Sequence, residues 1–112
     1  MATAARDKLL ASIEEPFGLN RTETGRVFGV SRQAIESWHN SGVPSARQEK
    51  AATVAAIAEL LSRRLKPERI PGVARRPAAA YGGLTMLEMI QSDRHLELLA
   101  IVRASFDWAQ TA

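Results

Sequence analysis

The sequence feature that most limits the fold is the spacing of the apolar residues. They recur every three or four positions in several segments, and nowhere do β-branched and aromatic residues alternate over five or more positions. Spacings of three and four place side chains on one face of an α-helix, whereas alternation is typical of a half-buried strand. Proline and glycine, which interrupt helices, separate these segments. The pattern predicts an all-α protein of five to six helices.

The ranges of the expected helices follow from these apolar stripes and from the residues between them. We expect helices over residues 4–15, 23–29, 32–40, 45–65, 85–92 and 94–109. Pro16 should end the first helix, because a proline has no N–H with which to continue it. Residues 66–83 are rich in proline, glycine and arginine and are expected to form a connector with little regular structure.

Polar residues suited to the N-cap position precede most of these segments. The candidates are Thr22, Ser31, Ser45, Thr85 and Asp93. Gln or Glu stands three residues after Ser45 and Thr85, which predicts a capping box at both helix starts.

The long segment 45–65 is expected to join two parts of the chain. Residues 1–65 should form an N-terminal helix-turn-helix bundle, and residues 66–112 a small C-terminal helical subdomain. Four apolar residues of the last segment share one stripe and should face the core, namely Leu96, Leu99, Val102 and Phe106. So small a protein has little stability to spare, which leads us to expect a homodimer.

Composition excludes several classes of protein. The 112 residues contain no cysteine, which excludes a disulfide scaffold and a thiolate zinc site. No apolar run approaches the roughly 20 residues needed to span a bilayer, and the first residues lack a signal-peptide core. We therefore expect a cytoplasmic protein that does not contact a membrane.

The residues that enzymes most often use are scattered. His39 and His95 are the only two histidines, and neither belongs to an HExxH motif or lies near a phosphate-binding glycine loop. His39 should be solvated or cap a helix end, His95 should be exposed, and Glu14 should be solvated. We expect no catalytic residue, no metal site, no cofactor and no enzymatic activity.

The basic residues are unevenly distributed. Residues 1–50 carry 7 basic and 6 acidic residues, residues 51–82 carry 6 and 2, and residues 83–112 carry 2 and 4. Phosphates would repel the acidic last segment. If the partner is a nucleic acid, it should bind the first part of the chain.

The segment 21–40, RTETGRVFGVSRQAIESWHN, has the spacing of a helix-turn-helix. Gly25 supplies a small residue where the two helices meet, and Gly29 can adopt the positive φ that a tight turn requires. Ile35 and Trp38, three residues apart, share a face with Val30 turned inward. A plain hairpin of two helices with a solvated polar face remains the alternative.

The opposite face of the second helix should meet DNA in the major groove. The candidates for base contacts are Arg32, Gln33, Glu36 and Ser37. Arg and Gln are the side chains suited to guanine and adenine edges. The candidates for phosphate contacts are Arg21, Ser31, Arg47 and Lys50.

The run FGVSRQAIESWHNSG resembles the motif of the Xre/Cro-like helix-turn-helix regulators of bacteria and phages. The matching residues are Gly29, Val30, Ser31, Arg32, Gln33, Ile35, Trp38 and Gly42. Gly25 departs from the family, which more often has Ala there. The resemblance implies sequence-specific binding to double-stranded DNA, with repression of a promoter.

A second run, PAAAYGGLTMLEMI at 77–90, is similar to the toxin-binding half of Xre/MbcA/ParS-type antitoxins. The matching residues are Pro77, Gly83, Thr85, Leu87 and Glu88, and Met86 stands where that family usually has Pro. The resemblance implies a toxin of the RES class, described as degrading NAD, whose pocket the C-terminal region fills. By position, Phe106, Asp107 and Trp108 would enter it.

Two functions therefore remain open. The first is a transcriptional repressor, cytoplasmic and associated with the nucleoid, whose last helices form a homodimer. The second is an antitoxin that neutralises a RES-type toxin through its C-terminal region and represses its own operon.

Overall fold

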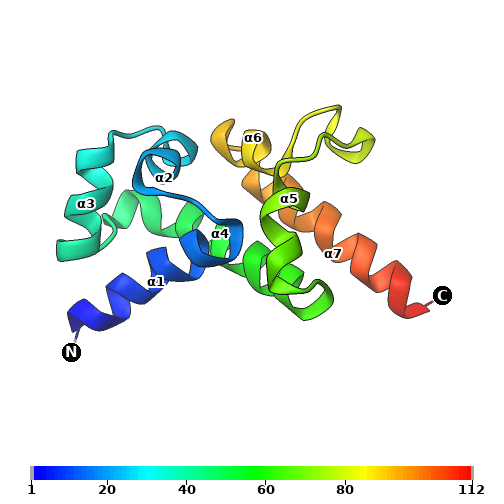
Figure 1. Ribbon diagram of the computed structural model, residues 1–112, viewed down its shortest axis with the longest axis horizontal. Coiled ribbons are helices and arrows are strands. Elements are labelled where there is room, and N and C mark those ends of the chain that lie inside the picture. The colour runs from blue at the N-terminus through cyan, green and yellow to red at the C-terminus, as the bar shows by residue number, and fades with distance from the viewer. Residues whose placement is uncertain (1, 112) are drawn as a thin grey trace.

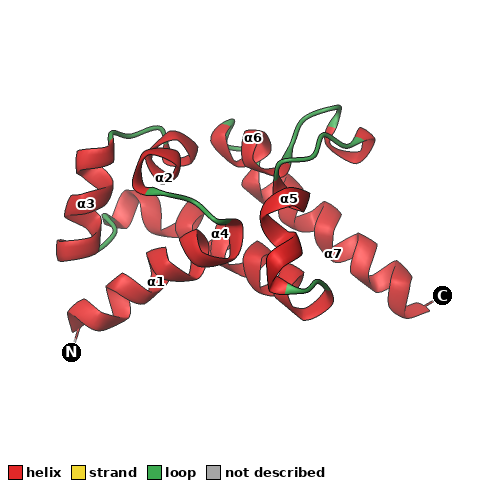
Figure 2. Cartoon of the chain, in the orientation of Figure 1, coloured by secondary structure: helices red, strands yellow, loops and turns green. Residues whose placement is uncertain are grey.

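The computed structural model describes residues 2–111, with side chains from Lys8 to Phe106. Within this part of the chain there are seven α-helices, two short 3-10 helices and no strand (Figure 2). The α-helices are α1 (Ala2–Phe17), α2 (Arg21–Phe28), α3 (Arg32–Ser41), α4 (Ser45–Arg64), α5 (Ile70–Ala74), α6 (Met86–Gln91) and α7 (His95–Thr111). The all-α prediction is confirmed, with more helices than the five to six expected.

The extra helix lies in the segment expected to be an irregular connector. A 3-10 turn (η1, Pro67–Arg69) leads directly into α5, and a second one (η2, Ala79–Tyr81) follows. Ile70 and Ala74, four residues apart on one face of α5, are buried in the core. Pro67 and Pro71 stand in the first turns of η1 and α5, where the missing N–H has no helical partner to lose. Burial of Ile70 and Ala74 therefore stabilises a helix in a segment whose composition predicts a loop.

The long helix α4 is the centre of the fold (Figure 1). It packs against α1 on one side and α7 on the other, while α2 and α3 pack on each other and α3 packs on α1. Helix α6 contacts both α2 and α7, so the N-terminal and C-terminal parts of the chain pack against each other there. The buried apolar residues form one cluster that runs from Leu10 in α1 to Val102 in α7.

Several helix boundaries differ from those predicted. Helix α1 continues through Pro16 to Phe17, whose side chain is fully buried in the core. The N-cap of α2 is Asn20 rather than Thr22, and Asn20 forms a capping box with Glu23. The backbone N–H of Asn20 donates to the Glu23 carboxylate and lowers the pKa of Glu23 below its ordinary value.

Of the other four predicted caps, two form and two do not. Ser31 caps α3, and Thr85 caps α6 in a capping box with Glu88, as predicted. The box at Ser45 is absent: α4 starts after Pro44 without a side-chain cap, and Gln48 donates to the Val43 carbonyl oxygen instead.

The first turn of α7 also differs from the prediction. Asp93 does not cap this helix; it occupies a left-handed turn with φ of 61°. His95, expected to be exposed, is buried at 7% exposure, and Leu96, expected in the core, is 60% exposed. Leu98 takes the place in the core that the spacing assigned to Leu96.

Candidate nucleic-acid interface

The turn between α2 and α3 is fixed by its own residues. Gly29 has φ of 70°, in the left-handed region, and a close hydrogen bond of 2.8 Å joins the Val30 N–H to the Gly25 carbonyl oxygen. A Cβ atom at Gly25 would lie 2.6 Å from the Val30 carbonyl oxygen, closer than real contacts allow. Glycine at position 25 is therefore needed for this turn, although the resembling family more often has alanine.

The inner face of α3 fixes the angle between α2 and α3. Ile35 is fully buried and Trp38 nearly so, as the three-residue spacing predicts. The Trp38 ring meets the Phe28 ring edge to face, with centroids 5.5 Å apart and planes at 79°. Val30, predicted to face inward, is half-buried against the same core.

The outer face of α3 is open to solvent. It presents Ser31, Arg32, Gln33, Glu36 and Ser37, all exposed. The Arg32 side chain is 65% exposed, and its Nε lies 3.9 Å from Glu36 Oε1. A helix that buries one side and leaves the predicted base-contacting side chains Arg32, Gln33, Glu36 and Ser37 exposed to solvent meets the geometric requirement for reading a groove.

The four predicted phosphate contacts differ in how far they are exposed to solvent. Ser31 is exposed and caps α3, so the hydroxyl and the helix N-terminus face the same side as Arg32. Arg47 is half-buried, and its Nη1 donates to the Phe28 carbonyl oxygen at 2.6 Å. Its guanidinium has further N–H donors beyond the one that this hydrogen bond uses.

Lys50 has a different role from the one expected of it. Its side chain is 8% exposed, and its ammonium group donates to the Val27 carbonyl oxygen and to Asp93 Oδ1, both at 2.8 Å. The charge also lies over the Phe28 ring, 5.5 Å from the centroid. We leave Lys50 out of the DNA-facing set, because reaching a phosphate would break these contacts.

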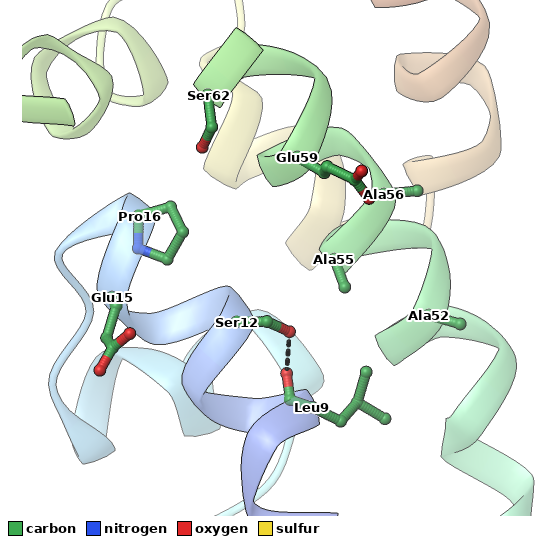
Figure 3. A pocket seen from close by; sticks show the side chains of 9 residues that line it. All are labelled: Leu9, Ser12, Glu15, Pro16, Ala52, Ala55, Ala56, Glu59 and Ser62. Carbon is green, nitrogen blue, oxygen red and sulfur yellow. Dashed lines mark hydrogen bonds between the residues drawn. The ribbon is translucent and has the colours of Figure 1, made fainter. Parts of the chain in front are cut away.

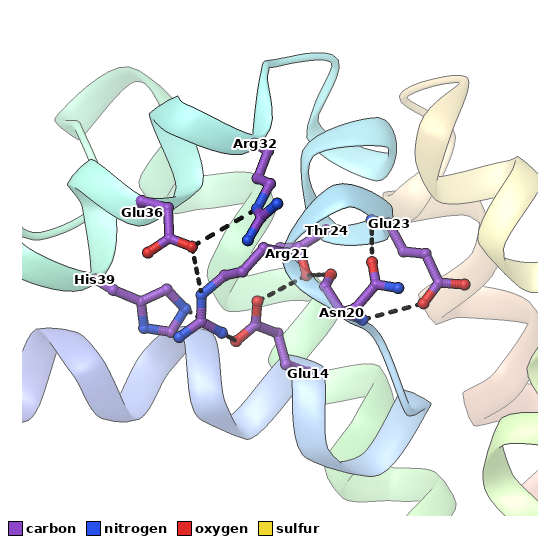
Figure 4. Close-up of polar contacts among 8 residues, drawn as sticks. All are labelled: Glu14, Asn20, Arg21, Glu23, Thr24, Arg32, Glu36 and His39. Carbon is purple, nitrogen blue, oxygen red and sulfur yellow. Dashed lines mark hydrogen bonds and ion pairs between the residues drawn. The ribbon is translucent and has the colours of Figure 1, made fainter.

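Arg21 belongs to a network that the sequence did not reveal (Figure 4). Its Nη1 donates to Glu14 Oε1 at 2.9 Å, and its Nε lies 3.7 Å from Glu36 Oε1. Glu14, expected to be solvated, is buried at 7% exposure. His39 Nε2 lies 2.9 Å from the same Glu14 oxygen, so His39 is neither solvated nor a helix cap. The partners of Glu14 are up to 25 residues away, which no local spacing could show.

No protein-family model and no curated protein matches this sequence. A solved structure does match: MbcA in the crystal structure of the M. tuberculosis MbcT-MbcA toxin-antitoxin complex. The two folds superpose with a TM-score of 0.73 over 89% of this chain and 91% of the other.

This chain shares its fold with the antitoxin MbcA. The two sequences are 18% identical, so the match shows the fold. It spans almost the whole length of both chains, so the likeness is not confined to the α2–α3 pair.

At the other end of the molecule, only one of the three predicted toxin contacts can be placed. Phe106 is half-buried against the core, with the Arg64 guanidinium 5.3 Å from its ring centroid. The side chains of Asp107 and Trp108 lie outside the described residues.

A groove of about 480 Å³ lies between α1 and α4 (Figure 3). Its lining includes Ala52, Ala55 and Ala56 of α4 and Ser12 of α1, whose hydroxyl donates to the Leu9 carbonyl oxygen. Among the residues that the structure describes, no group of three His, Cys, Asp or Glu side chains could bind a metal ion. None of the described helices is both long and apolar enough to cross a bilayer.

Proposed function

We propose that this chain is an antitoxin that binds a toxin protein and represses its own operon by binding DNA. The fold match to MbcA over about nine-tenths of both chains carries the first part. The resemblance of the 77–90 motif to Xre/MbcA/ParS-type antitoxins also supports it, and within that motif Thr85 and Glu88 form the capping box that starts α6. The toxin that this resemblance implies is of the RES class.

The two tasks divide along the chain in this proposal. Residues 1–65, with the open face of α3, contact double-stranded DNA, and residues 66–112 contact the toxin. The segment 104–112 would lie in the toxin pocket. A homodimer would place two α3 helices at two half-sites about one helical turn apart.

Co-expression with a neighbouring toxin-like reading frame tests the antitoxin role. The full chain should co-purify with that product and restore growth of cells that express it. Deleting 104–112 should abolish both effects and leave DNA binding intact. A truncated chain that still retains the toxin would contradict the role of this segment. A full chain that neither binds nor neutralises the product would contradict the antitoxin role itself.

DNA reading is tested separately with Arg32→Ala. The exposed position of Arg32 means that its loss should leave the fold intact. Binding to an operator selected from random sequences should weaken by about 1–3 kcal/mol, with little change on random DNA. Arg103→Ala, which removes the same charge from an exposed position on α7, is the matched control. Equal losses on both DNAs would show that Arg32 does not read bases.

A further inference from the structure

We propose that Glu14, a buried carboxylate on α1, is the positioning residue of the DNA-contacting surface. The proposal rests on the DNA-binding part of the proposed function. Glu14 is itself buried at 7% exposure and would act on DNA binding through Arg21.

Three side chains from the DNA-binding unit converge on this one carboxylate. Arg21 Nη1 and His39 Nε2 each lie 2.9 Å from Oε1, and the Thr24 hydroxyl donates to Oε2 at 2.7 Å. Because a carboxylate only accepts hydrogen bonds, His39 Nε2 must carry the proton and donate it. Glu14 therefore ties the first turn of α2 and the last turns of α3 to the same point on α1.

The network continues from the buried carboxylate to the open face of α3. Arg21 is 39% exposed, so part of its guanidinium reaches solvent at the N-terminus of α2. Its Nε lies 3.7 Å from Glu36 Oε1, and the same oxygen lies 3.9 Å from Arg32 Nε. Figure 4 shows the resulting order of alternating charges, from Glu14 through Arg21 and Glu36 to Arg32.

If Glu14 positions Arg21, removing Glu14 should weaken DNA binding. If Glu14 acts only through its negative charge, removing it should tighten DNA binding. These opposite outcomes make the proposal testable. A negative charge close to DNA weakens binding, so removing it should tighten binding if charge alone matters. A free arginine must lose rotamer freedom when it binds a phosphate, at a cost of about 0.5–1.5 kcal/mol. Glu14 has already fixed Arg21, so removing Glu14 should weaken binding in spite of the favourable change in charge.

The experiment compares Glu14→Gln with Glu15→Gln in the full chain. Glu15 is the next residue on α1 and is exposed, so the change in charge is matched. The probe is a mixed-sequence duplex of about 20 base pairs, since a phosphate contact does not depend on sequence. We expect binding about threefold to tenfold weaker for Glu14→Gln, and unchanged or tighter for Glu15→Gln. Glu14→Gln binding as tightly as the unmodified chain would overturn the proposal.

A double-mutant cycle separates positioning from general destabilisation. In an Arg21→Gln background, Glu14→Gln should not weaken DNA binding further, although it should still lower the urea midpoint of unfolding. Equal losses in both backgrounds would also overturn the proposal. If Glu14→Gln does not fold, Arg21→Lys decides: it keeps the charge but cannot reach both carboxylates, so it should bind more weakly than Arg26→Lys. An unmodified chain that binds no duplex would instead refute the proposed DNA binding.

Discussion

The molecule contains two helix corners, each a turn between consecutive helices, which have the same backbone hydrogen bonds but different residues at the left-handed position. At the first, between α2 and α3, the N–H groups of Gly29 and Val30 donate to the carbonyl oxygens of Arg26 and Gly25. At the second, between α6 and α7, Asp93 and Arg94 donate in the same way to Ile90 and Met89. Both pairs form the Schellman motif, in which the first donor residue is left-handed.

The difference lies in which residue accepts the left-handed conformation. Gly29 does so at no steric cost, whereas an L-residue such as Asp93, at φ of 61°, pays about 1 kcal/mol or more. The Asp93 carboxylate meets the buried Lys50 ammonium at 2.8 Å. This contact favours the strained turn, so the second corner depends on a residue 43 positions away.

Lys50 connects the two corners directly. The same ammonium group donates to the Val27 carbonyl oxygen, two residues before Gly29. The left-handed residue of the first corner needs no tertiary contact, although α4 also binds that corner through Lys50, while the left-handed residue of the second corner is held by the docked helix α4. The comparison teaches that identical hydrogen bonding can be encoded locally in one place and by tertiary contact in another.

The largest expected effect tests whether the first corner depends on the glycine at position 25. Gly25→Ala should favour the helix by about 1 kcal/mol through propensity alone. The added Cβ would, however, lie 2.6 Å from the Val30 carbonyl oxygen, and backbone cannot move away cheaply. We expect a net loss of about 2–3 kcal/mol in the free energy of unfolding, measured by urea denaturation.

Gly72→Ala provides the control, because a Cβ at this helical glycine of α5 would meet nothing within 4 Å. It should be neutral or stabilising by about 0.5–1 kcal/mol. Similar effects at the two glycines would show that the close approach of α2 to the turn does not limit the fold.

The next effect addresses the link between the corners. Lys50→Met keeps most of the side-chain volume but leaves the Val27 carbonyl oxygen and the Asp93 carboxylate without their donor. We expect a loss of about 2 kcal/mol, because hydrogen bonds to charged groups are among the stronger ones. Hydrogen exchange should also accelerate at the Val30 and Arg94 amides together. Lys66→Met, at an exposed position, should change stability by less than about 0.5 kcal/mol. Faster exchange at only one corner would refute the link.

The same contrast explains how far the sequence predicted the fold and the candidate site. Ser31, Gly29 and the box of Thr85 with Glu88 act on residues within four positions, and all were predicted. Glu14 and Lys50 have partners 7 to 43 residues away, so the local sequence marked them only as surface charges.

Helix α7 shows a second limit of sequence analysis. Apolar residues occur on more than one side of its first turns, so spacing alone could not choose the buried face. The prediction selected Leu96, but the docking of α7 on α4 buries His95 and Leu98 and leaves Leu96 exposed. His95 Nε2 lies 3.4 Å from Glu49 Oε1 on α4, a contact that spacing could not show either.

The smallest expected effect is a pH dependence of stability that arises at the second corner. The hydrogen bond from Lys50 and its charge lower the pKa of Asp93 below the ordinary value of 3.8. A carboxyl with a lowered pKa stabilises the fold above its ordinary pKa, and this contribution disappears as the pH falls through the folded value. Asp93→Asn removes the charge while keeping a residue that tolerates the left-handed turn. The variant should therefore melt slightly below the unmodified chain at pH 7, and the difference should shrink as the pH falls below about 4. Melting followed by circular dichroism from pH 7 to 3 measures this, and a difference that stays constant over that range would mean that Lys50 does not favour the turn through the Asp93 charge.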